Sequence, residues 1–428
     1  MQNNHTVAII NHGCKLNQYE GESIEYSLES RGYRIVDFKS TVSPDVVIVN
    51  TCTVTNRSDR KSRNTILRAA RMLGKKGLLI VTGCYAQTDP HDLERLQGVD
   101  LVIGNRQKAA IPDIIASHFR DHDSAQKELG PFDYQVPITP HRSRIFIKVQ
   151  DGCNMHCAYC KVPLARGKSV SREPESVVDA LNRIQENGFR EVVLTGVNIG
   201  SYNWHGRGLD LLLIKILQHT TDKLRIRLSS IEPESFTEAL LDIIAHPRIV
   251  PHFHVPLQSG SDRILKRMNR SCGVDDYVRI VDNIRKVKPD SHIATDIIVG
   301  FPGESKEDYA HTLELVERLH FASLHVFRFS PRAGTTAALL EDELTASEKG
   351  ERGRWLIEMG RRLNYDFRKR FEGTVRDAVF EKKRENFYGI TDNYIRVRIS
   401  HSGADLSRRL LPVEITDVGV DETIGCVV

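Results

Sequence analysis

The sequence predicts an α/β protein built from an N-terminal open parallel α/β sheet domain, a central partial (β/α)6 barrel and a small C-terminal β-barrel. Two spans, the first third and a longer middle part, alternate short apolar runs with helical patterns, which indicates parallel sheets. After Gly373 the pattern changes to short alternating strands, which is typical of a small all-β module. The 428 residues are enough for two or three domains, each with its own core.

The first domain, residues 1–124, contains three apolar runs that we interpret as buried parallel strands. They span residues 5–14, 45–52 and 77–84, and each ends on a cysteine. These cysteines are Cys14, Cys52 and Cys84. Because ligands gather beyond the carboxyl ends of parallel strands, we expect the three thiols at one edge of the sheet. Taken singly, a cysteine at a strand end is often only a small buried hydrophobe.

A basic block occupies residues 56–76, with eight lysines and arginines against a single acid, Asp59. Such a block raises the local concentration of a polyanion and makes its binding salt-dependent. The alternative is a well-solvated helix face. The net charge of +4 does not by itself identify a nucleic-acid partner.

The middle of the chain follows a polar, proline-bearing linker, residues 125–142, and covers residues 143–371. Six apolar runs alternate with five helical segments, which favours a partial barrel over a complete eight-fold one. We expect the catalytic edge at the C-terminal ends of these strands. A last helix is predicted to open at Thr345, because Glu348 completes a capping-box pattern.

The C-terminal module, residues 372–428, mixes aromatic and basic side chains as RNA-binding barrels do. The candidate RNA-binding residues are Tyr388, Tyr394, Arg396, Arg398, Lys382, Lys383 and Arg384. The alternative is a basic β-domain that only caps the rest of the protein.

The chain starts without a basic and then apolar leader, and no apolar run approaches the roughly 18 residues of a membrane helix. We therefore expect a cytoplasmic protein with no membrane partner. In a reducing cytosol its eight cysteines are better explained as metal ligands or reactive thiols than as disulfides. The sequence does not specify an oligomer, and a monomer is the expectation.

The stretch DGCNMHCAYC, residues 151–160, gathers Cys153, Cys157 and Cys160 without a fourth cysteine. Thiolates are soft ligands that select zinc, copper(I) or iron–sulfur clusters. A structural zinc site needs four protein ligands, and His156 is the available fourth. A cluster with one iron left open to an exogenous chelator fits the three thiols better.

The spacing Cys-x3-Cys-x2-Cys with Tyr159 before the last cysteine resembles the signature of the radical S-adenosylmethionine superfamily. The segments GCKLNQYE, NTCTVT, GCYAQ, GCNMHCAYCKVPLARG, HVPLQSGSDRILKRMNR, TDIIVGFPGE and FRFSPRAGT resemble the methylthiotransferases of that superfamily over nearly the whole chain. The first two are most similar to the branch that acts on N6-threonylcarbamoyladenosine in tRNA, next to the anticodon. The C-terminal module resembles the family's small RNA-binding TRAM barrel.

The resemblance implies two [4Fe–4S] clusters: an auxiliary one on Cys14, Cys52 and Cys84, and a radical SAM one on Cys153, Cys157 and Cys160. The resemblance also implies that one S-adenosylmethionine would methylate a sulfur on the auxiliary cluster. A second yields the radical that removes the hydrogen from carbon 2 of the adenine, so no side-chain acid or base is assigned. The implied partners are the tRNA anticodon arm and a low-potential electron donor such as flavodoxin or ferredoxin.

The expected cosubstrate-binding residues are Tyr159, Thr195, Gly196, Gln258, Ser259 and Asp296, although each would also satisfy hydrogen bonds at the barrel edge. Arg57, Arg60 and Arg63 are expected to meet the RNA backbone. Asn17, Thr51 and Thr53 flank the auxiliary cysteines and are expected to shape access to the sulfur. Departures from the family pattern occur at Lys161, Leu164 and Cys272, and none removes a ligand.

Two alternatives remain open at this stage. The same chemistry has other substrates within the family, namely isopentenyladenosine in tRNA and an aspartate of a ribosomal protein. A non-enzymatic alternative is an iron–sulfur or zinc protein that binds RNA and whose thiols are structural.

Overall fold

The structure is a computed structural model that describes residues 5–40, 42–74, 77–119, 129–138, 142–383, 386–399 and 405–428. Arg384 and parts of the predicted linker lie outside the described residues. The chain forms two compact units. The first comprises residues 1–139, 146–155 and 160–172, and the second comprises residues 140–145, 156–159 and 173–428. Each unit is described by itself.

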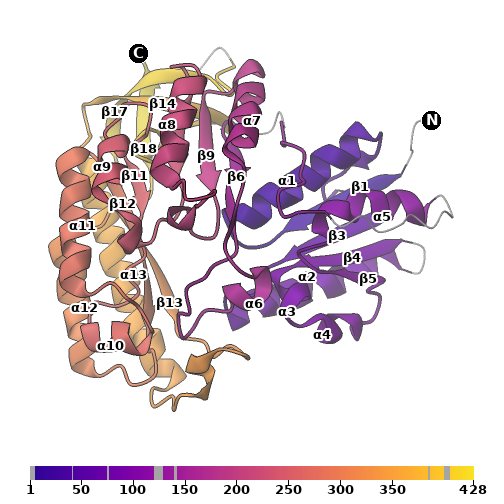
Figure 1. The fold of residues 1–428 in the computed structure, drawn as a ribbon, viewed down its shortest axis with the longest axis horizontal. Helices are drawn as coiled ribbons and strands as arrows, with labels where there is room; N and C mark the ends of the chain where they lie inside the picture. Colours follow the sequence, from indigo (N-terminus) through magenta and orange to yellow (C-terminus); the bar gives the residue numbers. More distant parts are fainter. Residues whose placement is uncertain are drawn as a thin grey trace. The chain divides into compact units, whose positions relative to one another are not determined.

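The first unit is built on a five-stranded parallel sheet with the order β2-β1-β3-β4-β5 (Figure 1). Its strands are β1 (Thr6–Asn11), β2 (Arg34–Ile35), β3 (Val46–Thr51), β4 (Leu78–Gly83) and β5 (Leu101–Ile103). The sequence patterns predicted the three long strands, and the structure confirms the open parallel sheet. The patterns missed β2 and β5, because two or three residues are too few to show a periodicity.

Helices cover both faces of this sheet, because successive strand residues point to opposite sides. Ile48 of β3 packs with Ile24 and Ile111 on one face, and Val49 packs with Ile66 and Tyr85 on the other. The first face is covered by α1 (Lys15–Ser30) and α5 (Ile111–His118), and the second by α2 (Asn56–Leu73), α3 (Cys84–Thr88) and α4 (Pro90–Glu94). In this doubly wound order the strand connections reverse direction between β1 and β3, and ligands bind at such a reversal.

Short elements complete the first unit. They are η1 (Lys108–Ala110), β7 (Gln150–Asp151), α6 (Val162–Arg166) and β8 (Val170–Ser171). The strands β7 and β8 pair antiparallel, and the cysteine loop of residues 152–161 lies between β7 and α6.

The central barrel has six strands, as predicted, in two three-stranded sheets with the orders β10-β9-β6 and β11-β12-β13. These are β6 (Ile145–Lys148), β9 (Glu191–Thr195), β10 (Arg225–Leu228), β11 (His252–His254), β12 (His292–Val299) and β13 (Ser323–Arg328). Isolated parallel bridges, such as Ser230 with His254, link the β10 and β11 segments. The sheets therefore continue into one open, partial barrel.

Helices alternate with these strands around the barrel. They are α7 (Pro174–Glu186), η2 (Ile199–Ser201), α8 (Leu209–His219), η3 (Pro233–Ser235), α9 (Glu238–Ile244), α10 (Asp262–Arg267), α11 (Val274–Val287), α12 (Lys306–Leu319) and η4 (Thr336–Leu339). The hydroxyl of Tyr277, on α11, lies 3.1 Å from the hydroxyl of Thr295 on β12. Thr295 therefore faces the helices, and its neighbours Asp296 and Ala294 face the barrel interior.

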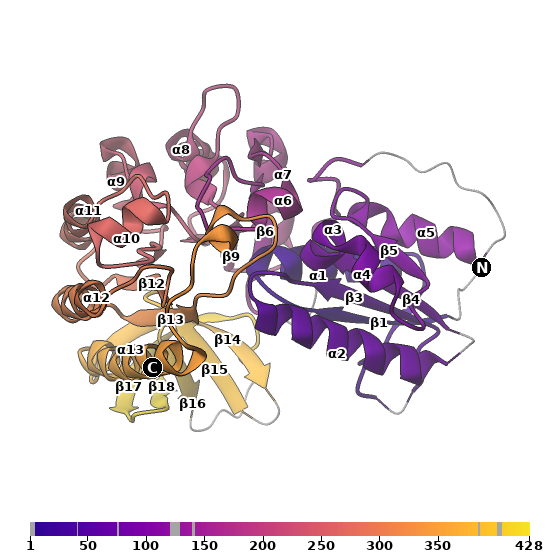
Figure 2. The same ribbon diagram turned by 90° about the horizontal axis from the view of Figure 1, so that it is seen from below.

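The long helix α13 (Ala346–Lys369) begins as predicted. The Thr345 hydroxyl accepts from the Glu348 amide at 3.2 Å, and the Glu348 carboxylate accepts from the Thr345 amide at 2.8 Å. A closed five-stranded barrel follows, with the order β14-β15-β16-β18-β17 (Figure 2). Its strands are β14 (Val375–Lys383), β15 (Asn386–Thr391), β16 (Arg396–Ile399), β17 (Leu410–Val418) and β18 (Thr423–Val427). The sequence patterns missed β18, which closes the barrel.

A buried cluster of charges joins the C-terminal barrel to the central one. Glu191, on β9, binds Arg225 and Arg227 of β10. Arg225 donates to the carbonyls of Asp377 and Ile390 at 2.8 and 2.9 Å. Burial disfavours the ionised Glu191, but the charges of Arg225 and Arg227 outweigh burial and lower the pKa of Glu191 to about 2. The carboxylate thus holds two guanidiniums that would otherwise be buried without a counter-charge.

We expect Glu191→Gln to lower the free energy of unfolding at pH 7 by about 3–5 kcal/mol, because it leaves buried arginines uncompensated. Since the folded pKa of Glu191 lies below its ordinary value of 4.5, its contribution is complete above pH 4.5. That contribution is lost as the pH falls toward 2. The difference in the free energy of unfolding between wild type and Glu191→Gln should therefore become smaller at low pH. Denaturant unfolding at several pH values measures this. Glu238→Gln, an exposed change on α9, is the control, and an equal loss in both variants would contradict the assignment.

Candidate functional site

The three cysteines of the first unit leave adjacent strands at the same edge of the sheet. Cys14 is the N-cap of α1 shortly after β1, Cys52 directly follows β3, and Cys84 opens α3 directly after β4. These strands are neighbours in the order β1-β3-β4, and the edge is the one where their connections reverse. The structure therefore gathers thiols that are 38 and 32 positions apart in the sequence.

Glycines set the sharp turns from strand to cysteine. Gly83 has φ 98° and ψ −166°, a conformation that is essentially restricted to glycine. A Cβ at Gly83 would lie 2.3 Å from the carbonyl oxygen of Thr51. Gly13, with φ 99°, is equally crowded, because a Cβ there would lie 2.9 Å from the sulfur of Cys52. Side chains at either glycine would push the cysteines away from each other.

The three thiols influence one another electrostatically, but they are not arranged around a single ion. Burial raises the pKa of Cys52 to about 12, and the negative charges of Cys84 and Cys14 add to this rise. A tetrahedral zinc ion, with Zn–S of about 2.3 Å, needs sulfurs roughly 3.8 Å apart. Within the described part of the chain, no group of three ligand atoms all closer than 4.8 Å includes a cysteine. The wider spacing fits a larger thiolate-bound group, such as an iron–sulfur cluster.

Asn17, on α1, ties the strand ends together next to these cysteines. Its side-chain amide donates to the carbonyls of His12 and Thr51, at 2.9 and 2.8 Å. Its Oδ1 accepts from Arg166 at 2.7 Å. Asn17 therefore connects the exits of β1 and β3 to α6, the helix that follows the cysteine loop.

Arg166 belongs to a fully buried charge network in the first unit. Glu20 accepts from Lys108 at 2.6 Å, from Lys148 at 2.7 Å and from Arg166 at 2.9 Å. Asp151, which directly precedes the cysteine loop, binds Lys148 and accepts from Arg166 at 3.0 Å. The segment on each side of the cysteine loop is thus fixed to the same carboxylate on α1.

The network carries one more positive than negative charge, with three cations against two carboxylates. Burial disfavours the ionised Glu20, but Arg166, Lys108 and Lys148 hold its pKa well below the ordinary value. Burial also opposes the charge of Arg166, yet Asp151, Glu20 and the nearby Cys84 raise the pKa of Arg166 well above its ordinary value. A buried positive surplus beside Cys84 suits a group with a net negative charge, as three thiolates around a cluster provide.

The cysteine loop has contacts in each unit. In the first unit the amide of Cys153 donates to the carbonyl of Gly167 at 3.1 Å. In the second, the amide of Ala158 donates to the carbonyl of Met268 at 2.9 Å, and Arg270 lies 3.7 Å from the sulfur of Cys157. Arg270 also binds Glu232, so its guanidinium is positioned to compensate a thiolate at Cys157.

The residues expected at the cosubstrate lie at strand ends of the barrel. Thr195 ends β9 and is 1% exposed, and its buried hydroxyl has no partner among the described residues; Gly196 follows it. Gln258 has φ 72°, an uncommon conformation for a residue with a side chain, and Ser259 next to it is buried. Tyr159 packs on an apolar cluster that includes Phe301.

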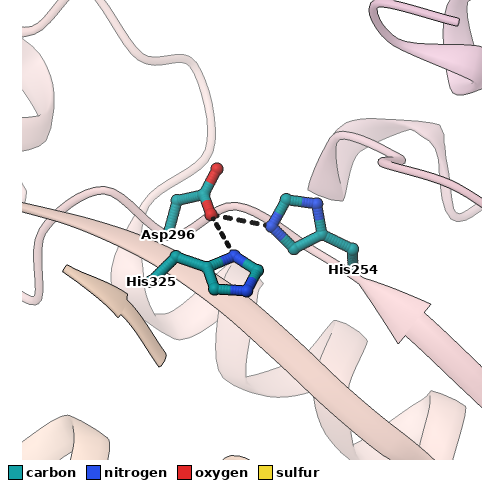
Figure 3. Close-up of side chains that lie close together, drawn as sticks. All are labelled: His254, Asp296 and His325. Atoms are coloured by element: carbon teal, nitrogen blue, oxygen red, sulfur yellow. Dashed lines mark hydrogen bonds and ion pairs between the residues drawn. The ribbon is translucent and has the colours of Figure 1, made fainter. Parts of the chain in front are cut away.

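Asp296 joins two histidines in the barrel interior (Figure 3). Its Oδ1 lies 2.8 Å from Nε2 of His254 and 3.0 Å from Nδ1 of His325. Burial raises the pKa of Asp296, but the hydrogen bonds from both histidines outweigh burial and lower it strongly. The three donor atoms lie within 4.8 Å of one another, as a divalent metal would require. However, His254 uses its second nitrogen on Ser230, at 2.6 Å, so both ring nitrogens of His254 already take part in hydrogen bonds.

Some of the candidate RNA-binding residues are exposed to solvent, and others are bound to neighbouring side chains of the protein. Arg57 and Arg60 are exposed on α2, and Lys382, Lys383 and Arg396 are exposed on the C-terminal barrel. By contrast, Arg63 donates to the hydroxyl of Tyr85 at 2.6 Å, and Arg398 pairs with Glu422 at 2.7 Å. The ring of Tyr394 lies against His252, with ring centroids 4.1 Å apart and the planes tilted by 32°, and so packs against the central barrel.

The departures from the family pattern have simple structural settings. Lys161 is buried and pairs with Asp89 at 2.6 Å, whereas Leu164 is exposed. Cys272 is buried, and burial raises its pKa to about 12.

Sequence reasoning missed several residues that the structure brings to the site. They are Glu20, Lys108, Lys148, Arg166, Arg270, His254 and His325. For Lys148, His254 and His325 the available signal was an ionisable residue inside an otherwise apolar strand, as in HFHVPL and SLHVFRFS, whereas the other four lie outside strands and had no such signal.

Comparison with known families agrees with the two-part arrangement of cysteines. Residues 147–316 match the Radical SAM superfamily, and residues 6–104 match the uncharacterized protein family UPF0004. The described residues include no helix that is long and apolar enough to cross a membrane.

Two solved structures share the fold. The radical S-adenosylmethionine methyltransferase TsrM from Kitasatospora setae aligns with a TM-score of 0.57 and 16% identity, covering 76% of this chain and 73% of that one. The cobalamin-dependent radical enzyme OxsB aligns with a TM-score of 0.54 and 12% identity, covering 82% and 56%. At these identities the likeness concerns the fold alone.

Curated relatives match nearly the full length. The threonylcarbamoyladenosine tRNA methylthiotransferase MtaB of Bacillus subtilis is 35% identical over 97% of this chain and 94% of its own, and that of Thermotoga maritima is 38% identical over 88% and 86%. A tRNA-2-methylthio-N(6)-dimethylallyladenosine synthase of Ehrlichia canis is 31% identical over 89% and 88%. This chain therefore belongs to the radical SAM methylthiotransferases, enzymes that use S-adenosylmethionine and carry two [4Fe–4S] clusters.

Proposed function

We propose that this enzyme places a methylthio group on carbon 2 of N6-threonylcarbamoyladenosine in tRNA, next to the anticodon. The observation that carries the proposal is the near full-length similarity to relatives named for that substrate, in a chain with two separate sets of three cysteines. Dimethylallyladenosine in tRNA is the second candidate, because relatives named for it match with comparable coverage.

The cysteine sets have different tasks in this proposal. Cys14, Cys52 and Cys84 hold the auxiliary cluster at the sheet edge of the first unit. Cys153, Cys157 and Cys160, within eight consecutive residues, hold the cluster that binds S-adenosylmethionine. When bound, these groups supply the sulfur and the radical chemistry that an unactivated aromatic C–H bond requires. The protein supplies position, charge and exclusion of water.

The residues around each set perform that work. Asn17 fixes the exits of two cysteine-bearing strands, and Arg166 provides a buried positive charge next to Cys84. Around the cosubstrate, the buried hydroxyl of Thr195, which has no partner among the described residues, is available for hydrogen bonding, and Tyr159 offers a ring at the end of the cysteine loop. Gly196 follows the end of β9, and Gln258 and Ser259 come after the end of β11.

The RNA is held by exposed cations in this proposal. Arg57 and Arg60 contact phosphates from α2, with Arg63 behind them on the same helix, and Lys382, Lys383 and Arg396 do so from the C-terminal barrel. Arg384 is grouped with them by sequence. Arg398 pairs with Glu422 on the barrel surface, and Tyr394 packs on His252 of the central barrel. A low-potential flavodoxin or ferredoxin delivers the electron.

The substrate is tested by nucleoside analysis of tRNA from a strain that lacks the gene. We expect 2-methylthio-N6-threonylcarbamoyladenosine to disappear and its precursor to accumulate, with 2-methylthio-N6-dimethylallyladenosine unchanged. Complementation with the wild-type gene should restore the product. Loss of the dimethylallyl product instead would move the assignment to the second candidate.

The cluster assignment is tested by replacing one cysteine in each set. Reconstituted wild-type enzyme should hold about eight irons in two [4Fe–4S] clusters, and Cys52→Ala or Cys157→Ala should each hold about four. Cys52→Ala should still cleave S-adenosylmethionine reductively, whereas Cys157→Ala should not. Cys426→Ala, an exposed cysteine remote from either set in sequence, is the control. Full iron content in Cys52→Ala would contradict the auxiliary site.

The role of α2 is tested by the salt dependence of tRNA binding. Replacing Arg57 and Arg60 with Ala should weaken binding and reduce the slope of log Kd against log salt by roughly 1 for each phosphate that the variant no longer neutralises. Replacing Arg279 with Ala removes an exposed arginine from α11 and is the matched control. An unchanged slope in the α2 variant would remove this helix from the RNA interface.

A further inference from the structure

The cluster of His254, Asp296 and His325 has a defined place in the barrel, which follows from strand register. Asp296 of β12 pairs directly with His325 of β13, and His254 of β11 pairs with Ala294. Paired residues in parallel strands point to the same face, so all three side chains lie on the face of Asp296. On β13, Leu324 faces α13, where a Cβ on Gly360 would meet it at 3.1 Å. His325 therefore faces the barrel interior.

The same interior face reaches the cysteine loop. Ile298, two residues after Asp296 on β12, packs in one cluster with Ala158, which directly follows Cys157. Residues two apart on one strand are about 7 Å apart along it. A second link is electrostatic: Arg270 contacts both Cys157 and Glu232, and the negative charge of Asp296 adds to the burial that raises the pKa of Glu232. The cluster thus lies next to the place where the radical is generated.

Among the described residues, one ring nitrogen of the cluster is left for a ligand. Both nitrogens of His254 are engaged, by Ser230 and Asp296. His325 uses Nδ1 on Asp296, its side chain is 54% exposed, and its Nε2 has no hydrogen-bond partner within the part of the chain that the structure describes. A carboxylate on one nitrogen fixes the orientation of an imidazole. Nε2 of His325 is therefore an oriented polar group facing the interior.

The two candidate substrates differ at a position that such a group can reach. Carbon 2, which reacts, and carbon 6, which carries the variable substituent, flank the same ring nitrogen of adenine. The threonylcarbamoyl substituent bears a carboxylate, a hydroxyl and a urea, whereas the dimethylallyl substituent is a hydrocarbon. A site built to hydrogen-bond a polar group rejects the analogue that lacks one, because its own polar atoms are then left unpaired.

We propose that His325, oriented by Asp296 and His254, hydrogen-bonds the polar N6 substituent and selects threonylcarbamoyladenosine over dimethylallyladenosine. This inference rests on the proposed function and assigns the residue that sets its specificity. His325 is the specificity-determining residue, and Asp296 and His254 are positioning residues. Asp296 accordingly serves the substrate rather than the cosubstrate.

The test uses the reconstituted full-length enzyme and three anticodon stem-loops that differ only at the target nucleotide. This nucleotide is adenosine, N6-threonylcarbamoyladenosine or N6-dimethylallyladenosine, and Kd is measured for each without turnover. Wild type should bind the threonylcarbamoyl RNA at least about tenfold more tightly than the dimethylallyl RNA, a difference of about 1.4 kcal/mol. His325→Phe should abolish this preference and leave the Kd for the unmodified RNA unchanged.

Further variants separate selection from a structural role. His325→Gln, which retains a hydrogen-bonding group, should keep part of the preference, and Asp296→Asn should reduce it because the ring is no longer held. His311→Gln, an exposed histidine on α12, should behave as wild type. A wild-type enzyme without any preference overturns the substrate assignment and this inference together. A preference that survives His325→Phe, or an equal loss of affinity for all three RNAs, overturns the inference alone. Zinc or iron beyond the two clusters that disappears in His325→Phe would also overturn it, in favour of a metal site.

Discussion

The buried contact between Glu20 and three cations is the constraint on which the first unit depends. Glu20 and Asp151 are removed from water, so they remain ionised only because Lys108, Lys148 and Arg166 surround them. Those cations come from three separate stretches of the chain, including both sides of the cysteine loop. The ion pairs therefore fix these three stretches relative to one another, since any shift of one stretch leaves a buried charge without its partner.

The same network of charges lies next to the three cysteines of the first unit. The doubly wound order places the exits of β1, β3 and β4 side by side, and glycines with positive φ turn the chain sharply into Cys14 and Cys84. Asn17 donates hydrogen bonds to backbone carbonyls at the ends of β1 and β3, and it accepts a hydrogen bond from Arg166. The surplus positive charge of the network matches the negative charge of a cluster held by three thiolates. Fold, charge and ligand set are consistent with one another.

The second unit also contains a buried carboxylate paired with cations, and there the charges join its two barrels. Glu191 binds two arginines whose remaining donors are taken up by carbonyls of the C-terminal barrel. The C-terminal barrel is thereby fixed to the central barrel, because separating these groups would leave buried charges without partners. Inside the barrel, Asp296 holds two histidines, and among the described residues one of them keeps a ring nitrogen open toward the interior. The clusters supply the chemistry of the family, and in our proposal the choice of substrate falls to His325.

The sequence by itself determined the fold class and the family, and it predicted the six cysteine ligands. Apolar runs predict strands because a strand of a parallel sheet is buried on both faces. Cys-x3-Cys-x2-Cys is a local pattern, and its resemblance to the family signature implied the cluster chemistry. Helix α13 was also readable, because a capping box at Thr345 involves residues only three apart.

The tertiary structure alone decided the buried charges and the barrel interior. Glu20 and Arg166 are 146 positions apart, and Asp296 meets His325 only through the register of two strands. Such pairs have no local signature, because burial and partner choice are set by how the strands and helices pack. The sequence likewise did not decide which arginines are exposed. Arg63 and Arg57 look alike in the sequence, yet Arg63 bonds Tyr85 and Arg57 faces solvent. Local patterns fix where elements begin, whereas long-range packing fixes which polar groups meet.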